Sequence, residues 1–320
     1  MANRSAAKAE GNSASLHLRQ RAESLSARLP PLLVAAERVA STVAQGVHGR
    51  RRVGLGETFW QFRRYEQGDS PQSIDWRQSG KSQAVFVREN EWEAAQSVWL
   101  WPDRSPSMVW RSSASLPTKR DRAELLVIAT AVLLVRGGER VGMLNSGRRP
   151  DHGRHALERM AIALSNPASG DPAIRVDHQG LPRPEPLPRH AQVVLVGDFL
   201  SPLDEVRRTL TGLAGRGVRG HLLQVLDPAE EILPFDGRVE FAGMEGEDNL
   251  LVPRVESIRQ AYQERLSAHR AGLADLARAA GWSFATHRTD RAPQTALLAL
   301  WGALSQEAVS AAPTASGASA

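Results

Sequence analysis

The sequence has 320 residues and a formal net charge of +5, with 42% hydrophobic and 23% charged residues. This is an ordinary balance for one large or two average globular domains. The absence of cysteine excludes disulfides, thiolate metal sites and a cysteine nucleophile. No run approaches the ~18 apolar residues of a spanning helix and the start has no apolar signal core, so we expect no transmembrane segment and a cytoplasmic protein.

The basic residues are almost all arginine, because lysine occurs only at Lys8, Lys81 and Lys119. Such a bias is weak evidence for nucleic-acid binding, and we expect no nucleic-acid partner. The arginines at 50–52 and at 63–64 keep nucleic-acid binding as a third hypothesis, behind the two that follow from the motifs below.

The chain divides by composition. Residues 1–12 and 306–320 are rich in Ala, Ser and Gly, so we expect both ends to be disordered. Residues 13–94 are expected to hold N-terminal helices, including two between 13 and 47, and a charged aromatic block. Within it, a strand over 85–87 is expected to pair with the next strand, over 97–101.

Beyond residue 95, predicted strands alternate with predicted helices up to about residue 305. This order predicts an α/β fold with a mostly parallel central sheet flanked by helices. Residues 166–190, rich in Pro, Gly and Asp, are predicted to be a loop. Apolar runs predict strands over 97–101, 141–144, 191–198, 221–226 and 282–286, with a polar edge strand over 237–242 and an antiparallel or irregular piece over 249–252. Helical periodicity predicts helices over 121–136, 154–164, 203–214, 255–280 and 295–304.

A candidate site follows the strand over 97–101, where Asp103, Ser105 and Ser107 share one loop. One carboxylate and two hydroxyls at alternate positions present three oxygens to one point, which suits Mg²⁺ or Mn²⁺. Asp198 ends another predicted parallel strand, and such strand ends meet at one edge of a sheet. The alternative interpretation is that both aspartates cap the helices that follow them.

Enzymatic interpretations find less support. Asp103 as the nucleophile of aspartyl-phosphate chemistry lacks a second Asp two residues later and a nearby Lys. The chain has no Gly-x-Ser-x-Gly for serine hydrolysis, and its nine His residues show no His-Glu-x-x-His spacing. We keep a metal-dependent hydrolase or phosphatase using Asp103 and Asp198 as the alternative function.

Two blocks of the sequence carry a resemblance to a known family. Over roughly residues 45–305 the chain resembles the domain of unknown function 58 family. The first block is highly specific, and the spacing to the second, the Asp-x-Ser-x-Ser-Met loop at 103–108, also fits. The residues of the first block are Glu57, Arg63, Tyr65, Gly68, Asp69, Ile74, Asp75 and Trp76.

The resemblance implies a von Willebrand factor A-like domain over residues 95–305, with an N-terminal helical and β extension. The metal-ion-dependent adhesion site of such domains uses Asp-x-Ser-x-Ser, a Thr from a later loop and an Asp after a later strand. Asp103, Ser105, Ser107 and Asp198 match this set. From Ala131 to Arg208 there is no threonine, so that ligand is missing or replaced by a serine such as Ser146. We expect the loss of one oxygen to weaken metal binding or to leave the site degenerate.

The resemblance also implies a non-catalytic role. Members of the family resemble accessory partners of MoxR-type AAA+ ATPases in the chaperone-like maturation or activation of other proteins. A second expected partner is a membrane-anchored von Willebrand factor A-like protein. We expect the Asp103 loop to dock a partner whose acidic side chain completes the coordination of a bound metal. The block at 57–77 is expected to join the N-terminal segment to the core.

Overall fold

The structure is a computed structural model that describes residues 31–47, 58–65, 74–81, 84–91, 96–165, 180–189 and 191–310. The predictions for residues 1–30 and 311–320, for the basic loop at 49–56 and for most of 166–190 lie outside these ranges. The chain divides into two compact units, one formed by Met1–Gly46 with Ser97–Ala320 and the other by Val47–Gln96. The two units are described separately here.

The unit at 47–96 contains a two-stranded antiparallel sheet of β1 (Thr58–Arg64) and β2 (Phe86–Glu91). Its short helix α3 (Trp76–Ser79) begins at Asp75, whose Oδ1 accepts a hydrogen bond from the Gln78 amide. The predicted pairing of the strand at 85–87 with the strand at 97–101 is wrong. β2 pairs with β1 instead, because both edges of the later strand are occupied by other partners.

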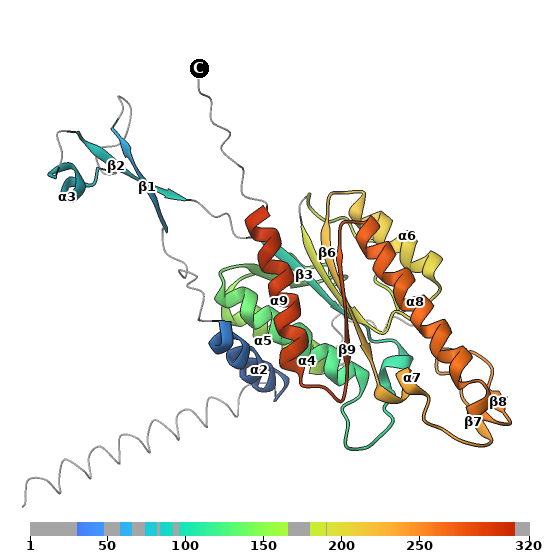
Figure 1. The fold of residues 1–320 in the computed structure, drawn as a ribbon. Coiled ribbons are helices and arrows are strands. Elements are labelled where there is room, and N and C mark those ends of the chain that lie inside the picture. Colours follow the sequence, from blue (N-terminus) through green and yellow to red (C-terminus); the bar gives the residue numbers. More distant parts are fainter. Residues whose placement is uncertain are drawn as a thin grey trace, which may run out of the picture. The chain divides into compact units, whose positions relative to one another are not determined.

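The larger unit is built on five parallel strands in the order β4-β3-β5-β6-β9. This sheet confirms the prediction of an α/β fold with a parallel central sheet flanked by helices (Figure 1). Its longer apolar strands were all located from sequence, because runs without polar interruption are typical of parallel strands covered on both faces. The strands are β3 (Ser97–Pro102), β4 (Arg140–Met143), β5 (Gln192–Gly197), β6 (Arg219–Leu226) and β9 (Ser283–Arg288).

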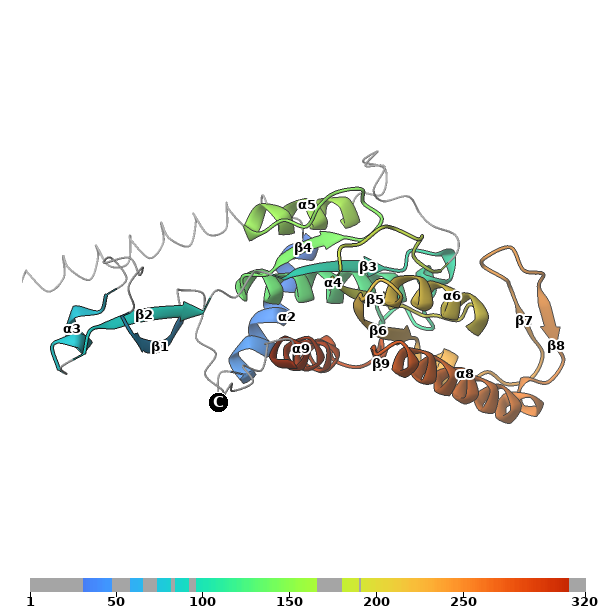
Figure 2. The same ribbon diagram turned by 90° about the horizontal axis from the view of Figure 1, so that it is seen from above.

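Helices cover both faces of this sheet (Figures 1 and 2). On one face, α6 (Leu203–Ala214) and α8 (Arg259–Ala279) bury a cluster that includes Trp99, Trp101 and Leu195. The alternate side chains, such as Leu100 and Val194, are fully buried toward the other face. That face is covered by α4 (Lys119–Arg136) and α9 (Pro293–Ser310), with α5 (Gly153–Ser165) packed against α4 and β4.

Helix α2 (Pro31–Val47) belongs to the larger unit, whereas the sequence grouped it with residues 13–94. Its apolar face is buried, and the Arg136 guanidinium of α4 donates to Ser41 at 3.2 Å. The helix therefore completes the core of the α/β unit although it precedes the family signature in the chain. The buried residues of this face are Leu33, Ala36, Val39, Ala40 and Val43.

Three further elements differ from their predicted forms. The polar strand over 237–242 is not an edge of the main sheet, because β9 occupies the position beside β6. Instead β7 (Val239–Phe241) pairs antiparallel with β8 (Leu250–Val252) as a separate hairpin. The helix expected over 255–280 begins as a 3₁₀ turn, Val255–Ser257, before α8. The helix expected to end at residue 304 continues to residue 310 as α9, into the segment predicted to be disordered.

Candidate functional site

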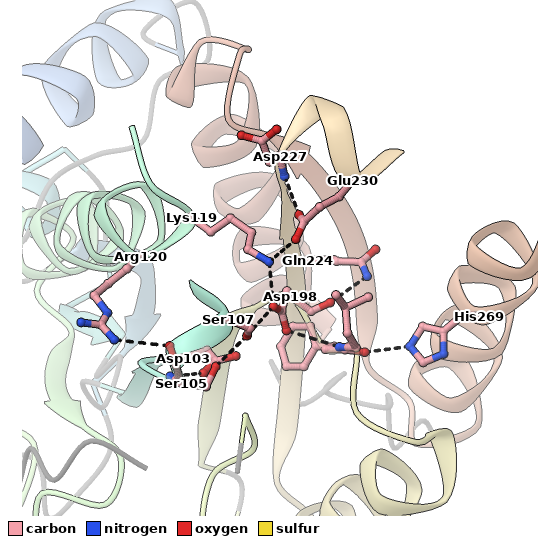
Figure 3. Close-up of polar contacts among 12 residues, drawn as sticks. Asp103, Ser105, Ser107, Lys119, Arg120, Asp198, Gln224, Asp227, Glu230 and His269 are labelled. Atoms are coloured by element: carbon pink, nitrogen blue, oxygen red, sulfur yellow. Dashed lines mark hydrogen bonds and ion pairs between the residues drawn. The ribbon is translucent and has the colours of Figure 1, made fainter. Parts of the chain in front are cut away.

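The four residues predicted as metal ligands lie together at the carboxyl edge of the parallel sheet (Figure 3). Asp103 follows β3 directly and Asp198 follows β5, which is the neighbouring strand. Ser107 Oγ donates to Asp198 Oδ2 at 2.8 Å, and the hydroxyls of Ser105 and Ser107 lie 3.0 Å apart. The sheet topology thus brings together residues that are 91 positions apart in the chain.

Neither aspartate caps the α-helix that follows it. The cap of α4 is Thr118, which forms a reciprocal capping box with Asp121, and α6 begins after Pro202 without a side-chain cap. Asp103 Oδ1 instead accepts from the Ser105 amide at 2.8 Å, and Asp198 Oδ1 accepts from the Leu200 amide at 3.3 Å. Each carboxylate therefore accepts a hydrogen bond from a backbone amide two residues later and stabilises its own loop.

Asp103 is fully buried, and its Oδ2 has no hydrogen-bond partner among the described residues. Burial, together with the nearby carboxylate of Asp198, raises the pKa of this carboxyl to about 7, although the hydrogen bonds from Ser105 oppose the shift. The backbone of Gly197 leaves the room that the side chain needs, since a Cβ there would lie 2.7 Å from the Asp103 Cβ.

Lys119 is the member of the site that sequence reasoning missed. It is the first residue of α4 and only 1% exposed, and its Nζ donates to Asp198 Oδ2 at 2.9 Å and to Glu230 Oε1. Burial lowers the pKa of this ammonium, but the carboxylates of Asp198 and Glu230 outweigh that effect and hold it above its usual value. The sequence offered no lysine for Asp103 and gave no sign that one lies against Asp198, where the fold carries the start of α4 over the strand ends.

A third strand end contributes the acidic partner of Lys119. Asp227 follows β6 and caps the short helix α7 (Pro228–Ile232), accepting from the Ala229 amide through Oδ1 and from the Ser112 amide through Oδ2. Glu230 in turn accepts a hydrogen bond from the Asp227 backbone amide with its other oxygen, Oε2. Asp227 could have been predicted in the same way as Asp198, because it too directly follows a predicted parallel strand.

The backbone after β5 is fixed by two side chains. Gln224 Nε2 donates to the Asp198 carbonyl at 2.8 Å, and the His269 ring nitrogen Nε2 lies 2.7 Å from the Phe199 carbonyl (Figure 3). Phe199 has a φ of 49°, a left-handed conformation that is strained for a bulky residue, and its side chain is buried. The surrounding contacts thus hold the Asp198 carboxylate in one position.

The arrangement does not fit a divalent cation among these four residues. Asp198 Oδ2 already accepts from Ser107 and from the Lys119 ammonium. Two unit charges of the same sign about 4 Å apart repel by about 4 kcal/mol near a protein surface, and a divalent ion doubles this. No group of three or more His, Asp or Glu side chains within the described ranges is placed to hold a metal. The Lys119 ammonium supplies the positive charge beside Asp198.

An open cavity of about 1410 Å³ lies above this network. Ser107, Lys119, Asp198 and Glu230 belong to its lining. Other parts of its wall come from Leu200 after β5 and from the segment of β7 and its turn. The apolar side chains of that wall include Leu200 and Met244, which are 44% and 42% exposed, together with Phe235 and Phe241.

The residues of the family signature lie in the other unit. Ile74 forms a β-bridge with Val87, Asp75 caps α3, and Trp76 is 69% exposed. Tyr65 is exposed directly after β1, and Arg63 is part of that strand. Glu57, Gly68 and Asp69 lie outside the described residues, as do the arginines at 50–52. Asp75 and Ile74 therefore have local structural roles, which accounts for part of the signature.

Fold and site together define an α/β protein with a parallel sheet and an ion-paired polar cluster at its carboxyl edge. The chain belongs to the family described as "Protein of unknown function DUF58", which matches residues 61–272. It is 28% identical over 281 residues to "Uncharacterized protein Rv1480" of Mycobacterium tuberculosis (strain ATCC 25618 / H37Rv) and to "Uncharacterized protein Mb1516" of Mycobacterium bovis. Each alignment covers 83% of this chain and 86% of the relative.

Two solved structures from Bacteroides show weaker similarity. The conserved hypothetical protein BatB from Bacteroides thetaiotaomicron aligns with a TM-score of 0.39 at 13% identity, over 66% of this chain and 100% of its own. An aerotolerance-related membrane protein from Bacteroides fragilis aligns with a TM-score of 0.38 at 15% identity and the same coverage. At these scores neither adds to the family assignment. In the part of this chain that the structure describes, no helix combines the length and apolar character needed to cross a membrane.

Proposed function

We propose that this chain is a non-catalytic protein-interaction module with a von Willebrand factor A-like core. Its partner is a MoxR-type AAA+ ATPase, and the pair acts in the chaperone-like maturation or activation of other proteins in the cytoplasm. The identity of the partner rests on the family resemblance of the two sequence blocks. The observation that carries docking at this face is the open cavity over the polar cluster, with exposed apolar side chains in its wall.

The composition of the cavity supports protein binding. Leu200 and Met244 are large apolar side chains left about two-fifths exposed in the wall of one concave surface, and apolar anchors surrounded by polar groups are typical of interaction sites. The polar groups of the wall, Ser107, Lys119, Asp198 and Glu230, already pair with one another, which supports a fixed recognition surface. Asp103 Oδ2 is unpaired among the described residues, but Asp103 is fully buried and does not line the cavity. A hydrolase would need a polar group free to act on a substrate.

A pull-down from the native host's lysate tests this proposal. Tagged wild type is compared with Leu200→Glu and with the control Ile162→Glu, which changes an exposed apolar residue of α5 that does not line the cavity. We expect mass spectrometry to identify an AAA+ ATPase with wild type and control, reduced at least about tenfold with Leu200→Glu, since hot-spot anchors contribute 2 kcal/mol or more. Equal recovery in all three samples contradicts docking at this face, and an ATPase absent from all contradicts the partner.

The alternative of a metal-dependent hydrolase or phosphatase using Asp103 and Asp198 has a separate test. Purified wild type and Asp103→Asn are incubated with a generic phosphate ester and Mg²⁺. We expect the same background turnover in both. Turnover by wild type that disappears in Asp103→Asn would show that the protein is an enzyme and would overturn the non-catalytic proposal.

A further inference from the structure

Lys119 is the most deeply buried lysine or arginine of the described residues, and it lies at the carboxyl edge of the sheet. Its ammonium shares one oxygen of Asp198 with the hydroxyl of Ser107, at 2.9 and 2.8 Å. It therefore lies among the residues that match the ligands of a metal-ion-dependent site. Its second acidic partner, Glu230, is fixed from the opposite side by the capping box of α7.

We infer that the Lys119 ammonium takes the place of a divalent cation, so that this face carries its own positive charge and docks a partner without a metal. The consequence for docking rests on the proposed function. The absence of ion binding itself is a property of this chain alone and is measured without a partner.

The contacts of the ammonium support this substitution. Asp198 and Glu230 form two ion pairs with one nitrogen that is 1% exposed, and breaking such a buried arrangement leaves uncompensated charges. A divalent cation would have to displace the ammonium before it reached the Asp198 oxygen. The side chain starts from the capped first turn of α4 and is buried along its length.

Removing the ammonium should create the site that the sequence pattern led us to expect. Without Lys119, the carboxylates of Asp198 and Glu230 lose their shared cation, and Asp103 Oδ2 already lacks a hydrogen-bond partner among the described residues. The freed oxygen of Asp198, with the oxygens of Asp103, Ser105 and Ser107 that lie beside it, then forms a hard-oxygen donor set of the kind that holds Mg²⁺ or Mn²⁺. The inference therefore predicts a gain of ion binding on mutation.

The first experiment uses wild-type protein. Mn²⁺ is titrated calorimetrically and by the paramagnetic resonance signal of free Mn²⁺, and thermal unfolding is recorded with MgCl₂ and with chelator. We expect no saturable binding and the same Tm in both conditions. A dissociation constant below about 100 μM, or a Tm that rises with Mg²⁺, would overturn the inference, whether or not any variant folds.

The second experiment compares Lys119→Ser with the charge-preserving control Lys119→Arg. We expect Lys119→Ser to show saturable Mn²⁺ binding with a dissociation constant below about 100 μM, which wild type lacks, and to gain thermal stability from Mg²⁺, while Lys119→Arg does neither. A folded Lys119→Ser that does not bind Mn²⁺ contradicts the inference.

In the lysate pull-down, ATPase recovery should be equal with Mg²⁺ and with chelator. Recovery that needs Mg²⁺ contradicts metal-free docking, whereas an ATPase missing from both contradicts the proposed function and leaves the ion result standing.

Discussion

At the scale of single residues, close packing at the strand ends determines what the site tolerates. Gly197 ends β5 where the Asp103 side chain approaches the backbone, and a Cβ there would lie 2.7 Å from the Asp103 Cβ and 3.0 Å from its Oδ2. Contacts this short force neighbouring atoms to move, which costs about 1–3 kcal/mol in a packed interior.

We therefore expect Gly197→Ala to lower the free energy of unfolding by about 1–3 kcal/mol, measured by urea denaturation. Gly212→Ala is the matched control, because Gly212 is exposed in the last turn of α6 and a Cβ there meets no atom within 4 Å. That control should gain about 0.5–1 kcal/mol from helix propensity. Equal effects of the two substitutions would show that Gly197 is not constrained by Asp103.

A second residue-scale prediction concerns His287 of β9, which is 5% exposed. Burial and the Arg122 guanidinium beside its Nε2, opposed by Asp290, together lower the pKa of its imidazole to about 4. Because the pKa in the folded state is below that of the unfolded chain, the neutral ring stabilises the protein above about pH 6.5. This contribution is lost as the pH falls toward 4.

Acidification from pH 7 to pH 4 should therefore remove up to about 3 kcal/mol of stability through this residue. His287→Gln keeps an acceptor for Arg122 but cannot titrate, so its free energy of unfolding should fall less over that interval. Chemical denaturation at several pH values measures the difference between the two proteins. Parallel curves would contradict the assignment.

At the scale of elements, the cap of α4 determines where Lys119 lies. Thr118 Oγ1 accepts from the Asp121 amide at 3.0 Å, and Asp121 Oδ2 accepts from the Thr118 amide at 3.2 Å. Both bonds fix the first turn, whose first residue is Lys119. A helix start that lost them would fray, since its amide groups would lack partners.

Thr118→Ala is expected to lower the free energy of unfolding by about 1 kcal/mol, while Thr118→Ser, which retains the hydroxyl, should lie close to wild type. Denaturant titration of the three proteins distinguishes the cap from a simple loss of volume. A stable Thr118→Ala variant would mean that the ion pairs of Lys119 alone hold the helix start.

Elements were predictable from sequence where one local signal dominated. The strand β5 and the helix α4 are apolar along most of their length, so their type and approximate position followed from the pattern. The three-residue strands β7 and β8 form a hairpin outside the main sheet, and no local signal distinguishes such a pair from an edge strand. The predicted partner of β2 was wrong for a related reason, because which strands pair depends on the arrangement of all the strands and not on the local sequence.

Only part of the candidate site could be predicted by the same reasoning. Asp103 and Asp198 were found because each follows a predicted parallel strand, and the topology then placed them side by side. Lys119 was not found, because its position depends on how the loop between Ser107 and Thr118 returns α4 to the strand ends. Lys119 pairs with Asp198 and Glu230, from which it is separated by 79 and 111 positions in the chain, and ion pairs at such separations leave no local pattern in the sequence.

At the scale of the whole molecule, the central sheet of the α/β unit receives no strand from the segment at 47–96. All five strands lie between Ser97 and Arg288, and the segment from Val47 to Gln96 forms a separate compact unit. Helix α2, which precedes that segment in the chain, contributes buried residues to the α/β unit, including Leu33 and Ala40. The core is therefore assembled from two stretches of chain that an independent unit interrupts.

Two variants test this organisation. One replaces residues 48–95 by a flexible Gly/Ser linker and keeps α2, and the other begins at Ser97 and lacks it. We expect the linker variant to unfold cooperatively with a free energy close to that of the α/β transition in wild type. The shorter variant should lose about 3 kcal/mol or more, because a buried Leu or Val contributes about 1.5–3 kcal/mol and α2 buries several. Thermal and denaturant unfolding, followed by far-UV circular dichroism, compares them. Equal stability of the two variants would show that α2 is dispensable, and non-cooperative melting of the linker variant would show that residues 47–96 are part of the same folding unit.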